Sequence, residues 1–252
     1  MVAKIYQTTA SADLLGYLTS WGSEDPLSDH GSFSPATSPY DQWAGGGEEV
    51  SGESNYSVLL EGDFTYGTYG GFTGTVDTLT FGVGLSGDSA SGFSIDTTQL
   101  TVDLGGSATT TAFNYAVYGL MGTGGTVNMD YLYSYLAATG TEQYGTTGND
   151  KQYSFAGNDT FTGNAGDDTF VFDDGWATDV ITDFGTSTGD LDVLDFSAVS
   201  FIGDVDDLID NYSNWYDSTG VLTISDGTNT LTLTGYVGSD IYTLLANDQL
   251  VA

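Results

Sequence analysis

Three consecutive nine-residue segments near the middle of the chain repeat an aspartate and a glycine at fixed positions. The segments span 145–153, 154–162 and 163–171. The repeated residues are Asp150, Asp159 and Asp168, and Gly148, Gly157 and Gly166. The pattern is that of the calcium-binding nonapeptide G-G-x-G-x-D-x-U-x, where U is a large apolar residue. Glycine permits the tight turn that brings carbonyls together, and aspartate supplies the hard oxygen ligands that Ca²⁺ prefers. The repeat therefore predicts bound Ca²⁺.

Two nonapeptides are expected to complete one coil, so that turns two repeats apart lie on the same side. Asp150 and Asp168 are then expected to face one ion. Asp159 is expected on the opposite side, beside a later carboxylate. The candidates for that carboxylate are Asp173, Asp174, Asp179 and Asp183. The eighth residue of each repeat should point into the core, although the first repeat has Gln152 there. Ordinary hairpins with Gly-Asp turns are the alternative, which three aligned copies disfavour.

The charge balance restricts the classes of partner. The 252 residues include 35 acidic and two basic residues, for a net charge of −33. Binding to nucleic acid or to an anionic membrane requires lysine and arginine, so both are disfavoured. Mutual repulsion of so many carboxylates instead favours a divalent cation or a salty medium.

Residue types that most enzymes require are scarce. There is no cysteine and one histidine, which excludes disulfides, thiolate metal sites and the zinc-protease motif H-E-x-x-H. No Ser-His-Asp set is identifiable, and nothing selects a catalytic pair from the carboxylates. We therefore expect a binding protein, not an enzyme.

Neither a cleaved N-terminal signal peptide nor a membrane-spanning segment is expected. The N-terminal sequence MVAKIYQTTASADLL lacks a sufficiently long apolar run, and no stretch approaches 18 apolar residues. If the protein is exported, its export signal must lie elsewhere in the sequence.

The N-terminal part predicts an α+β domain, a curved antiparallel sheet with helices. Apolar periodicity from Leu14 to Trp21, with Ser11 as N-cap, predicts a helix. Alternating apolar residues predict strands between 56 and 104, followed by helices near 109–121 and 127–139.

The domain boundary is expected where the nonapeptides begin, giving domains 1–142 and 143–252. The second is expected to be an all-β parallel β-roll or β-sandwich. Near its end we expect an amphipathic helix over 205–216, a hairpin of 221–225 with 230–234, and a last helix capped by Ser239.

The region from 144 to 252 resembles the RTX-type, serralysin-like secretion domains of Gram-negative bacteria. Besides the nonapeptides, the resemblance rests on TFVFDDGWATDVITDF, GDLDVLDFSAV and LTLTGYVGSDIYTLLANDQLVA. It implies extracellular localisation, an uncleaved C-terminal signal and a type I exporter as partner. It also implies that the β-roll folds when Ca²⁺ binds outside the cell, in keeping with the coupling of metal binding to folding.

The region from 1 to 142 resembles the secreted haemophores of the HasA type. The segments are YLTSWGSEDPLSDH, GDFTY, GTVDTLTFGVGLSG and NYAVYGLMGTGG. The resemblance implies ferric b-type haem as cofactor, His30 and Tyr66 as iron ligands, and an outer-membrane haem receptor or a haemoprotein as partner. Imidazole and phenolate both suit ferric iron. Apolar walls are expected from Phe33, Tyr40, Trp43 and Tyr69.

Two departures from that family matter for function. The family has a second histidine that hydrogen-bonds the tyrosine ligand, whereas this chain has a single histidine. The chain also has no arginine to pair with haem propionates. A calcium-dependent self-assembling protein of a filament, surface layer or biofilm, with a HasA-like fold and no haem, is the alternative.

Overall fold

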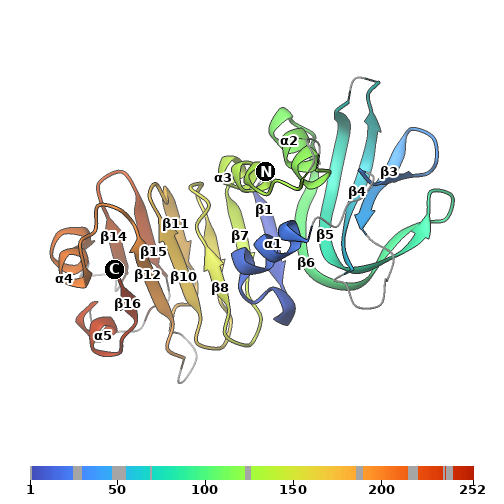
Figure 1. The fold of residues 1–252 in the computed structure, drawn as a ribbon. Helices are drawn as coiled ribbons and strands as arrows, with labels where there is room; N and C mark the ends of the chain where they lie inside the picture. Colours follow the sequence, from blue (N-terminus) through green and yellow to red (C-terminus); the bar gives the residue numbers. More distant parts are fainter. Residues whose placement is uncertain are drawn as a thin grey trace. The chain divides into compact units, whose positions relative to one another are not determined.

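The computed structural model describes residues 2–24, 30–46, 55–68, 70–122, 126–185, 190–214, 221–234, 236 and 241–252. The chain forms two compact units (Figure 1). The first comprises residues 1–6 and 16–136, and the second comprises residues 7–15 and 137–252.

The first unit is built on a largely antiparallel sheet with strand order β1-β6-β5-β4-β3-β2. The strands are β1 (Ala3–Gln7), β2 (Ser32–Ser34), β3 (Tyr40–Gly46), β4 (Tyr56–Tyr66), β5 (Phe72–Asp88) and β6 (Gly92–Ala108). Register shifts interrupt the pairing of β4 with β5 and of β5 with β6. Such bulges bend a strand pair. The sheet and its long β4, β5 and β6 agree with the strands expected between 56 and 104 (Figure 1).

Helices of the first unit pack their apolar side chains against this sheet. They are α1 (Leu14–Ser23), α2 (Thr111–Leu120) and α3 (Asp130–Thr139). Trp21 of α1 meets Phe81 of β5 edge to face at 5.1 Å, and both side chains are fully buried. Phe113 of α2 lies 6.3 Å from Phe72 of β5 and 5.5 Å from Tyr135 of α3. The mixed fold with three helices at the expected places is therefore confirmed for this unit.

The expected N-cap of the first helix is wrong. Ser11 belongs to a 3₁₀ helix, η1 (Thr9–Ser11), whose own N-cap is Thr8. The hydroxyl of Ser11 accepts the backbone N–H of Thr8 at 2.9 Å and closes a capping box. Ser11 is engaged in this earlier turn, so α1 begins only at Leu14.

From residue 141 to residue 198, successive strands of the second unit lie alternately in two sheets. One sheet has the order β13-β14-β15-β11-β9-β7 and the other β16-β12-β10-β8. The strands that follow the nonapeptide period are β7 (Thr141–Tyr144), β8 (Lys151–Tyr153), β9 (Thr160–Thr162), β10 (Thr169–Asp173), β11 (Thr178–Ile181) and β12 (Val193–Ala198). β7, β8, β9 and β10 each pair in parallel with the strand two further along, as in β8 with β10 and β7 with β9. β11 and β12 pair in parallel with β15 and β16.

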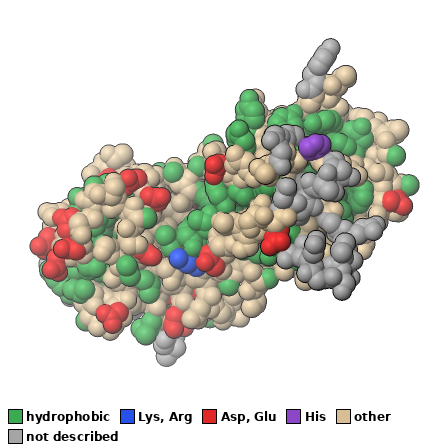
Figure 2. Space-filling view, viewed as in Figure 1, with side chains coloured by type: hydrophobic (Ala, Val, Ile, Leu, Met, Phe, Trp, Pro, Cys, Tyr) green, Lys and Arg blue, Asp and Glu red, His purple; other side chains and the backbone are tan. Residues whose placement is uncertain are grey.

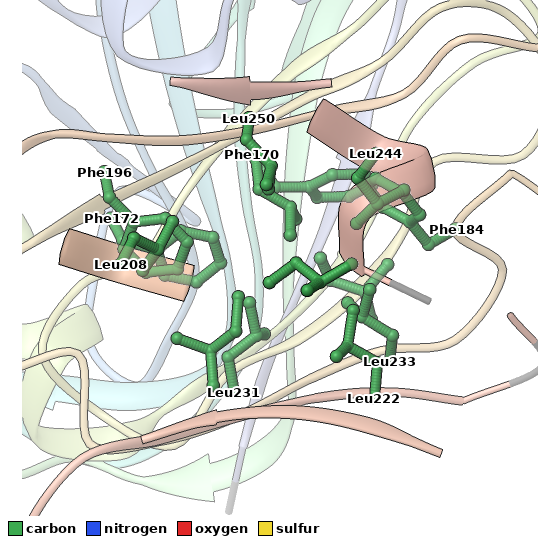
Figure 3. Close-up of a cluster of buried hydrophobic side chains, with 14 of the residues drawn as sticks. Phe170, Phe172, Phe184, Phe196, Leu208, Leu222, Leu231, Leu233, Leu244 and Leu250 are labelled. Carbon is green, nitrogen blue, oxygen red and sulfur yellow. The ribbon is translucent and has the colours of Figure 1, made fainter. Parts of the chain in front are cut away.

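The core of the second unit lies between these strands and changes character along the chain. Phe170, Phe172 and Phe196 are fully buried in an aromatic and aliphatic cluster, and Phe172 stacks on Phe196 at 4.7 Å (Figure 3). At the same repeat position, Gln152 is fully buried and donates to Gln7 Oε1 at 3.2 Å. The first coil therefore places a polar side chain where later coils bury phenylalanine; its Nε2 is hydrogen-bonded, whereas its Oε1 has no partner in the described structure.

The end of the chain adds short elements to this unit. They are α4 (Val205–Asp207), the π-helix η2 (Leu208–Tyr212), β13 (Ser213–Asn214), β14 (Leu222–Ser225), β15 (Thr230–Leu233), α5 (Ile241–Ala246) and β16 (Leu250–Val251). The antiparallel pair β14 and β15 confirms the expected hairpin. The continuous helix expected over 205–216 is wrong, because the chain enters β13 at Ser213. Ser239 lies outside the described residues.

Candidate functional site

His30 is held at the surface of the first unit by two hydrogen bonds. Its Nδ1 lies 2.8 Å from the carbonyl oxygen of Met121, directly after α2. Its own carbonyl accepts the indole N–H of Trp43 at 3.0 Å. A carbonyl can only accept, so Nδ1 must carry the proton, and in the neutral ring Nε2 carries the lone pair. The imidazole is exposed, and Figure 2 shows this single histidine on the molecular surface.

Tyr66 ends β4 and is half-buried among aromatic rings. Its ring centroid lies 5.2 Å from Phe33 and 5.2 Å from Phe72. Tyr118 of α2 is the ionisable side chain that acts on its phenol. Burial raises the pKa of the Tyr66 phenol, and the neighbouring Tyr118 raises it further. Tyr66 is therefore a neutral phenol at pH 7 in this state.

The end of α2 lies beside both candidate ligands. The hydroxyls of Tyr118 and Tyr66 both lie near Gly70, and Met121 accepts the hydrogen bond from His30. Tyr118 and Met121 are three apart at the C-terminal end of the helix, which places them on neighbouring positions of its surface. The structure thus brings His30 and Tyr66, 36 positions apart in the sequence, to the same end of one helix.

The expected apolar walls are only partly present. Phe33 packs on Tyr40 at 4.6 Å and on Tyr66, which makes an aromatic cluster beside the tyrosine. Trp43 is fully buried, so it acts as a core residue that fixes His30 and not as a wall. Tyr69 lies outside the described residues.

A cavity of about 500 Å³ opens elsewhere on the first unit. Asp41, Glu61 and Asp77 are among its lining residues, and neither His30 nor Tyr66 is. Such a polar, acidic lining does not suit an apolar macrocycle.

In the second unit, the repeated aspartates are buried and hydrogen-bonded to backbone N–H groups. Asp168 Oδ1 accepts the N–H of Asp150 at 2.8 Å, and Asp179 Oδ1 accepts the N–H of Asp159 at 2.8 Å. Asp192 continues the first series, because its Oδ1 accepts the N–H of Asp168 at 3.0 Å. We call these five residues the aspartate ladder. All five are at most 4% exposed.

Both carboxylate oxygens of Asp159 accept hydrogen bonds. Its Oδ1 accepts the N–H and the hydroxyl of Thr141, both at 2.7 Å, and its Oδ2 accepts the N–H of Phe155 at 2.8 Å. Asp183, the other predicted ligand, lies outside the ladder and accepts the N–H groups of Gly163 and Asn164. Structural hydrogen bonding therefore accounts for much of the aspartate pattern.

Two of the three repeated glycines, Gly157 and Gly166, allow another part of the backbone to approach closely. A Cβ built on Gly166, where φ is +120°, would lie 2.6 Å from the carbonyl carbon of Gly148. A Cβ on Gly157 would lie 2.4 Å from the carbonyl oxygen of Ala137. Any larger residue at either position would push the two backbone segments apart.

Burial and mutual repulsion raise the pKa values of the ladder. Burial is the main cause of the shift of Asp168 to about 7, and Asp192, Asp150 and Asp183 add to it. Burial, then Asp159, raises the pKa of Asp179 to about 8. In the described part of the chain, no group of three or more histidine, cysteine, aspartate or glutamate side chains is placed to hold a metal ion.

Asp192 was missed by the sequence analysis, although a signal was present. Each ladder aspartate comes two residues before a residue that points into the core, as in Asp168-Thr-Phe170 and Asp192-Val-Leu194. The spacing between repeats lengthens before Asp192, which hides it from a strict nine-residue search. Tyr118 and the carbonyl of Met121 were also missed, because their role depends on tertiary contacts.

No protein-family model matches the chain, and no curated protein matches it. Among solved structures, it is similar to holo hemophore HasA from Yersinia pestis, with 23% identity, a TM-score of 0.42, and coverage of 54% of this chain and 88% of that chain. A HasA mutant monomer from Yersinia pseudotuberculosis gives 24% identity, a TM-score of 0.41 and coverage of 54% and 88%. Similarity at this level does not assign a function, which has to be argued from the side chains.

None of the described helices is long and apolar enough to cross a membrane.

Proposed function

We propose that the first unit is an extracellular haem-binding domain of haemophore type, with His30 and Tyr66 as the residues that hold the iron. The observation that carries the proposal is the hydrogen bond between His30 Nδ1 and the carbonyl of Met121. Histidines that bind metals commonly donate their other ring N–H to a carbonyl or carboxylate, which fixes the tautomer and the ring orientation. His30 is exposed, and this hydrogen bond orients its ring.

Tyr66 would supply a second iron ligand of a different chemical type. A bound haem would supply ferric iron, a Lewis-acidic centre for which imidazole and phenolate are suitable ligands. Tyr66 would have to lose its phenol proton to solvent, since burial raises the pKa of this phenol. The adjacent Phe33 and Phe72 rings offer apolar contact to a flat macrocycle. The proposed role is capture and carriage of haem, not catalysis, with transfer to an outer-membrane receptor or haemoprotein.

We propose that the second unit binds Ca²⁺ and serves export through a type I system. The support from the site is two buried carboxylate oxygens without a hydrogen-bond partner in the described structure, Asp150 Oδ1 and Asp179 Oδ2. The hydroxyl of Ser154 lowers the pKa of Asp179 but lies outside hydrogen-bonding geometry. An unpaired buried carboxylate oxygen is costly, so a cation beside it would be stabilising. The export role rests on the sequence resemblance alone.

Titration of the purified chain with ferric protoporphyrin IX tests the haem proposal. The wild type should give a shifted Soret band, and His30→Ala and Tyr66→Phe should each weaken binding by at least about 10-fold, the scale expected for loss of a metal-ligand contact. Tyr131→Phe is the matched control, because Tyr131 is 46% exposed on α3. If the wild-type spectrum is that of free haem, the proposal is wrong.

A further inference from the structure

The strand β8 ends its sheet, so one of its edges needs a cover. The sheet has the order β16-β12-β10-β8, and β8 pairs with β10. The other edge of such a strand presents N–H and C=O groups that can pair with another chain unless something covers them. In the second unit, a side chain of β7 and a short segment of residues 7–13 lie along this edge.

The side chain of Gln143, in β7, pairs with one peptide group of β8. Its Nε2 donates to the carbonyl of Tyr153 at 2.7 Å, and its Oε1 accepts the N–H of Tyr153 at 3.3 Å. A side-chain amide has the same donor and acceptor groups as a peptide. Gln143 therefore takes the place of a neighbouring strand at this residue.

Residues 7–13, which we call the clasp, cover the next part of the edge. They belong to the second unit, although residues 16–136 belong to the first. The carbonyl of Ala12 accepts the N–H of Lys151 at 2.6 Å, and Asp13 forms a parallel β-bridge with Lys151. The carboxylate of Asp13 accepts the hydroxyl of Tyr153 at 2.9 Å. The clasp therefore pairs with β8 through both its backbone and a side chain.

Gln7 anchors the clasp in the interior of the first coil. Its Oε1 accepts a hydrogen bond from Gln152 Nε2 at 3.2 Å. Its Nε2 donates to the carbonyls of Ser11 and Ala12 at 2.8 and 3.1 Å. Gln152 is fully buried and Gln7 is 8% exposed. One side chain thus connects the core of the first coil to the turn that carries Ala12.

The clasp is held by hydrogen bonds more than by buried apolar surface. Its buried side chains are the polar ones of Gln7 and Ser11, whereas Ala10 is exposed and Ala12 is half-buried. Segments with few buried apolar contacts open locally, at a lower free energy than the core. The clasp can therefore detach while the phenylalanine core of the later coils stays folded.

We propose that the clasp is a releasable strap that closes the edge of β8 and keeps the first coil of the roll formed. With the clasp docked, Lys151 is fixed, and Asp150 directly before it keeps its N–H on Asp168. With the clasp detached, the N–H of Lys151 loses its partner and Gln152 loses the one it has in Gln7. The strap acts in this way whether or not the second unit binds Ca²⁺.

The two lysines of the chain make docking of the clasp measurable. Selective ¹⁵N-lysine labelling gives amide signals from Lys4 and Lys151 alone, and Lys151→Arg identifies the second by its loss. In the full chain with EDTA present, the amide of Lys151 should exchange slowly with solvent. Gln7→Ala should accelerate this exchange by at least about 10-fold, and Tyr153→Phe by roughly 3- to 10-fold, the factors for loss of several hydrogen bonds and of one.

Tyr144→Phe is the matched control. It removes a hydroxyl that is bonded to Glu142 within β7, at 2.9 Å, and so leaves the bonds of the clasp intact. The exchange of the Lys151 amide should then stay within about twofold of the wild type. In the Asp13→Ala background, Tyr153→Phe should cause no further acceleration, because the bond that it removes is already lost.

Dependence on urea separates local release from unfolding of the whole unit. Local opening exposes little surface, so the exchange rate of Lys151 should hardly change at urea concentrations well below the unfolding midpoint. A rate that rises with urea in parallel with global unfolding would overturn the proposal, because the clasp would then not be released by itself.

Three further results would also overturn it. One is an amide of Lys151 that exchanges in the wild type as fast as in an unfolded chain. Another is exchange that neither Gln7→Ala nor Tyr153→Phe accelerates, and the third is equal acceleration by Tyr144→Phe. Circular dichroism checks that each variant is folded. Should Gln7→Ala fail to fold, Tyr153→Phe still decides, because it leaves the buried amides in place.

Discussion

Polar side chains in this protein are placed by hydrogen bonds with the backbone as much as by ligand chemistry. Asp159 is fully buried, yet its two oxygens accept three hydrogen bonds from Thr141 and Phe155. His30 likewise gains its orientation from a backbone carbonyl. A carboxylate or imidazole that is already held by the backbone loses little entropy when it takes part in binding.

Replacing Asp159 tests whether its hydrogen bonds to the backbone stabilise the second unit. Asp159→Ala removes the acceptor of three donors, two of them backbone N–H groups, and leaves a small void. We expect a loss of about 3 kcal/mol in the free energy of unfolding of the second unit, since unsatisfied buried donors cost about 1–3 kcal/mol each. Urea unfolding with EDTA present measures it. The control Asp206→Ala, at an exposed position, should change stability by less than about 0.5 kcal/mol. Equal effects of the two variants would contradict the structural role.

At the scale of elements, the aspartate ladder connects strands that are far apart in sequence. Asp192 bonds to the turn before β10, and Asp168 bonds to the turn before β8. The ladder gains backbone hydrogen bonds but brings like charges together, as the raised pKa values of Asp168 and Asp179 show. The contribution of the aspartate ladder to the free energy of unfolding must therefore depend on pH when no cation is present.

The direction of this pH dependence follows from linkage. The folded-state pKa values of about 7 for Asp168 and about 8 for Asp179 lie above the ordinary value of 3.8, so the folded state binds more protons between these limits. The stabilisation is fully present below about pH 4 and is lost as the pH rises through 7 to 8. With EDTA present, the second unit should therefore be more stable at pH 5 than at pH 8, by up to about 1.4 kcal/mol per pH unit for each group.

Urea unfolding at pH 5, 6.5 and 8, followed by tryptophan fluorescence, to which buried Trp176 of the second unit contributes, measures this dependence. Asp168→Asn is the matched variant, because its amide oxygen can still accept the N–H of Asp150 but does not titrate. It should flatten the pH dependence. A wild-type stability that is constant or rises from pH 5 to pH 8 would refute the expected sign.

At the scale of the whole molecule, the net charge of −33 opposes compaction unless ions reduce it. The second unit concentrates buried carboxylates, and the first contains the candidate haem ligands. A cation that binds the folded second unit would stabilise it by mass action and would make its folding depend on the medium.

Calcium titration tests this dependence on the complete chain. If Ca²⁺ binds only the folded state, a concentration 100-fold above the dissociation constant should add about 2.7 kcal/mol of stability. That corresponds to a rise of about 5–10 °C in Tm. EDTA should reverse the rise, equal ionic strength from NaCl should not reproduce it, and Asp168→Asn should reduce it. A Tm that is the same in EDTA and in Ca²⁺ would remove the calcium proposal.

Light scattering in the same samples tests the alternative, because ordered polymers that form only with Ca²⁺ would favour self-assembly.

Several features were determined by the sequence by itself because they depend on local periodicity. The nine-residue spacing of aspartates and glycines predicted the phase of the strands from β8 to β10. Alternating apolar residues predicted β4, β5 and β6, and the helices α2 and α3 followed from their own periodicity. In each case the signal lies within a window of about ten residues, where side-chain direction follows directly from the backbone.

The tertiary structure decided how the candidate residues are used, because those contacts join distant parts of the chain. The sequence named His30 and Tyr66, but only the fold placed both at the end of α2 and supplied Met121 and Tyr118 as their neighbours. The sequence presented the aspartates as ion ligands, whereas the fold gave them backbone N–H groups 18 to 24 residues away. Hydrogen bonds across such separations depend on how coils and strands stack, which no local pattern specifies.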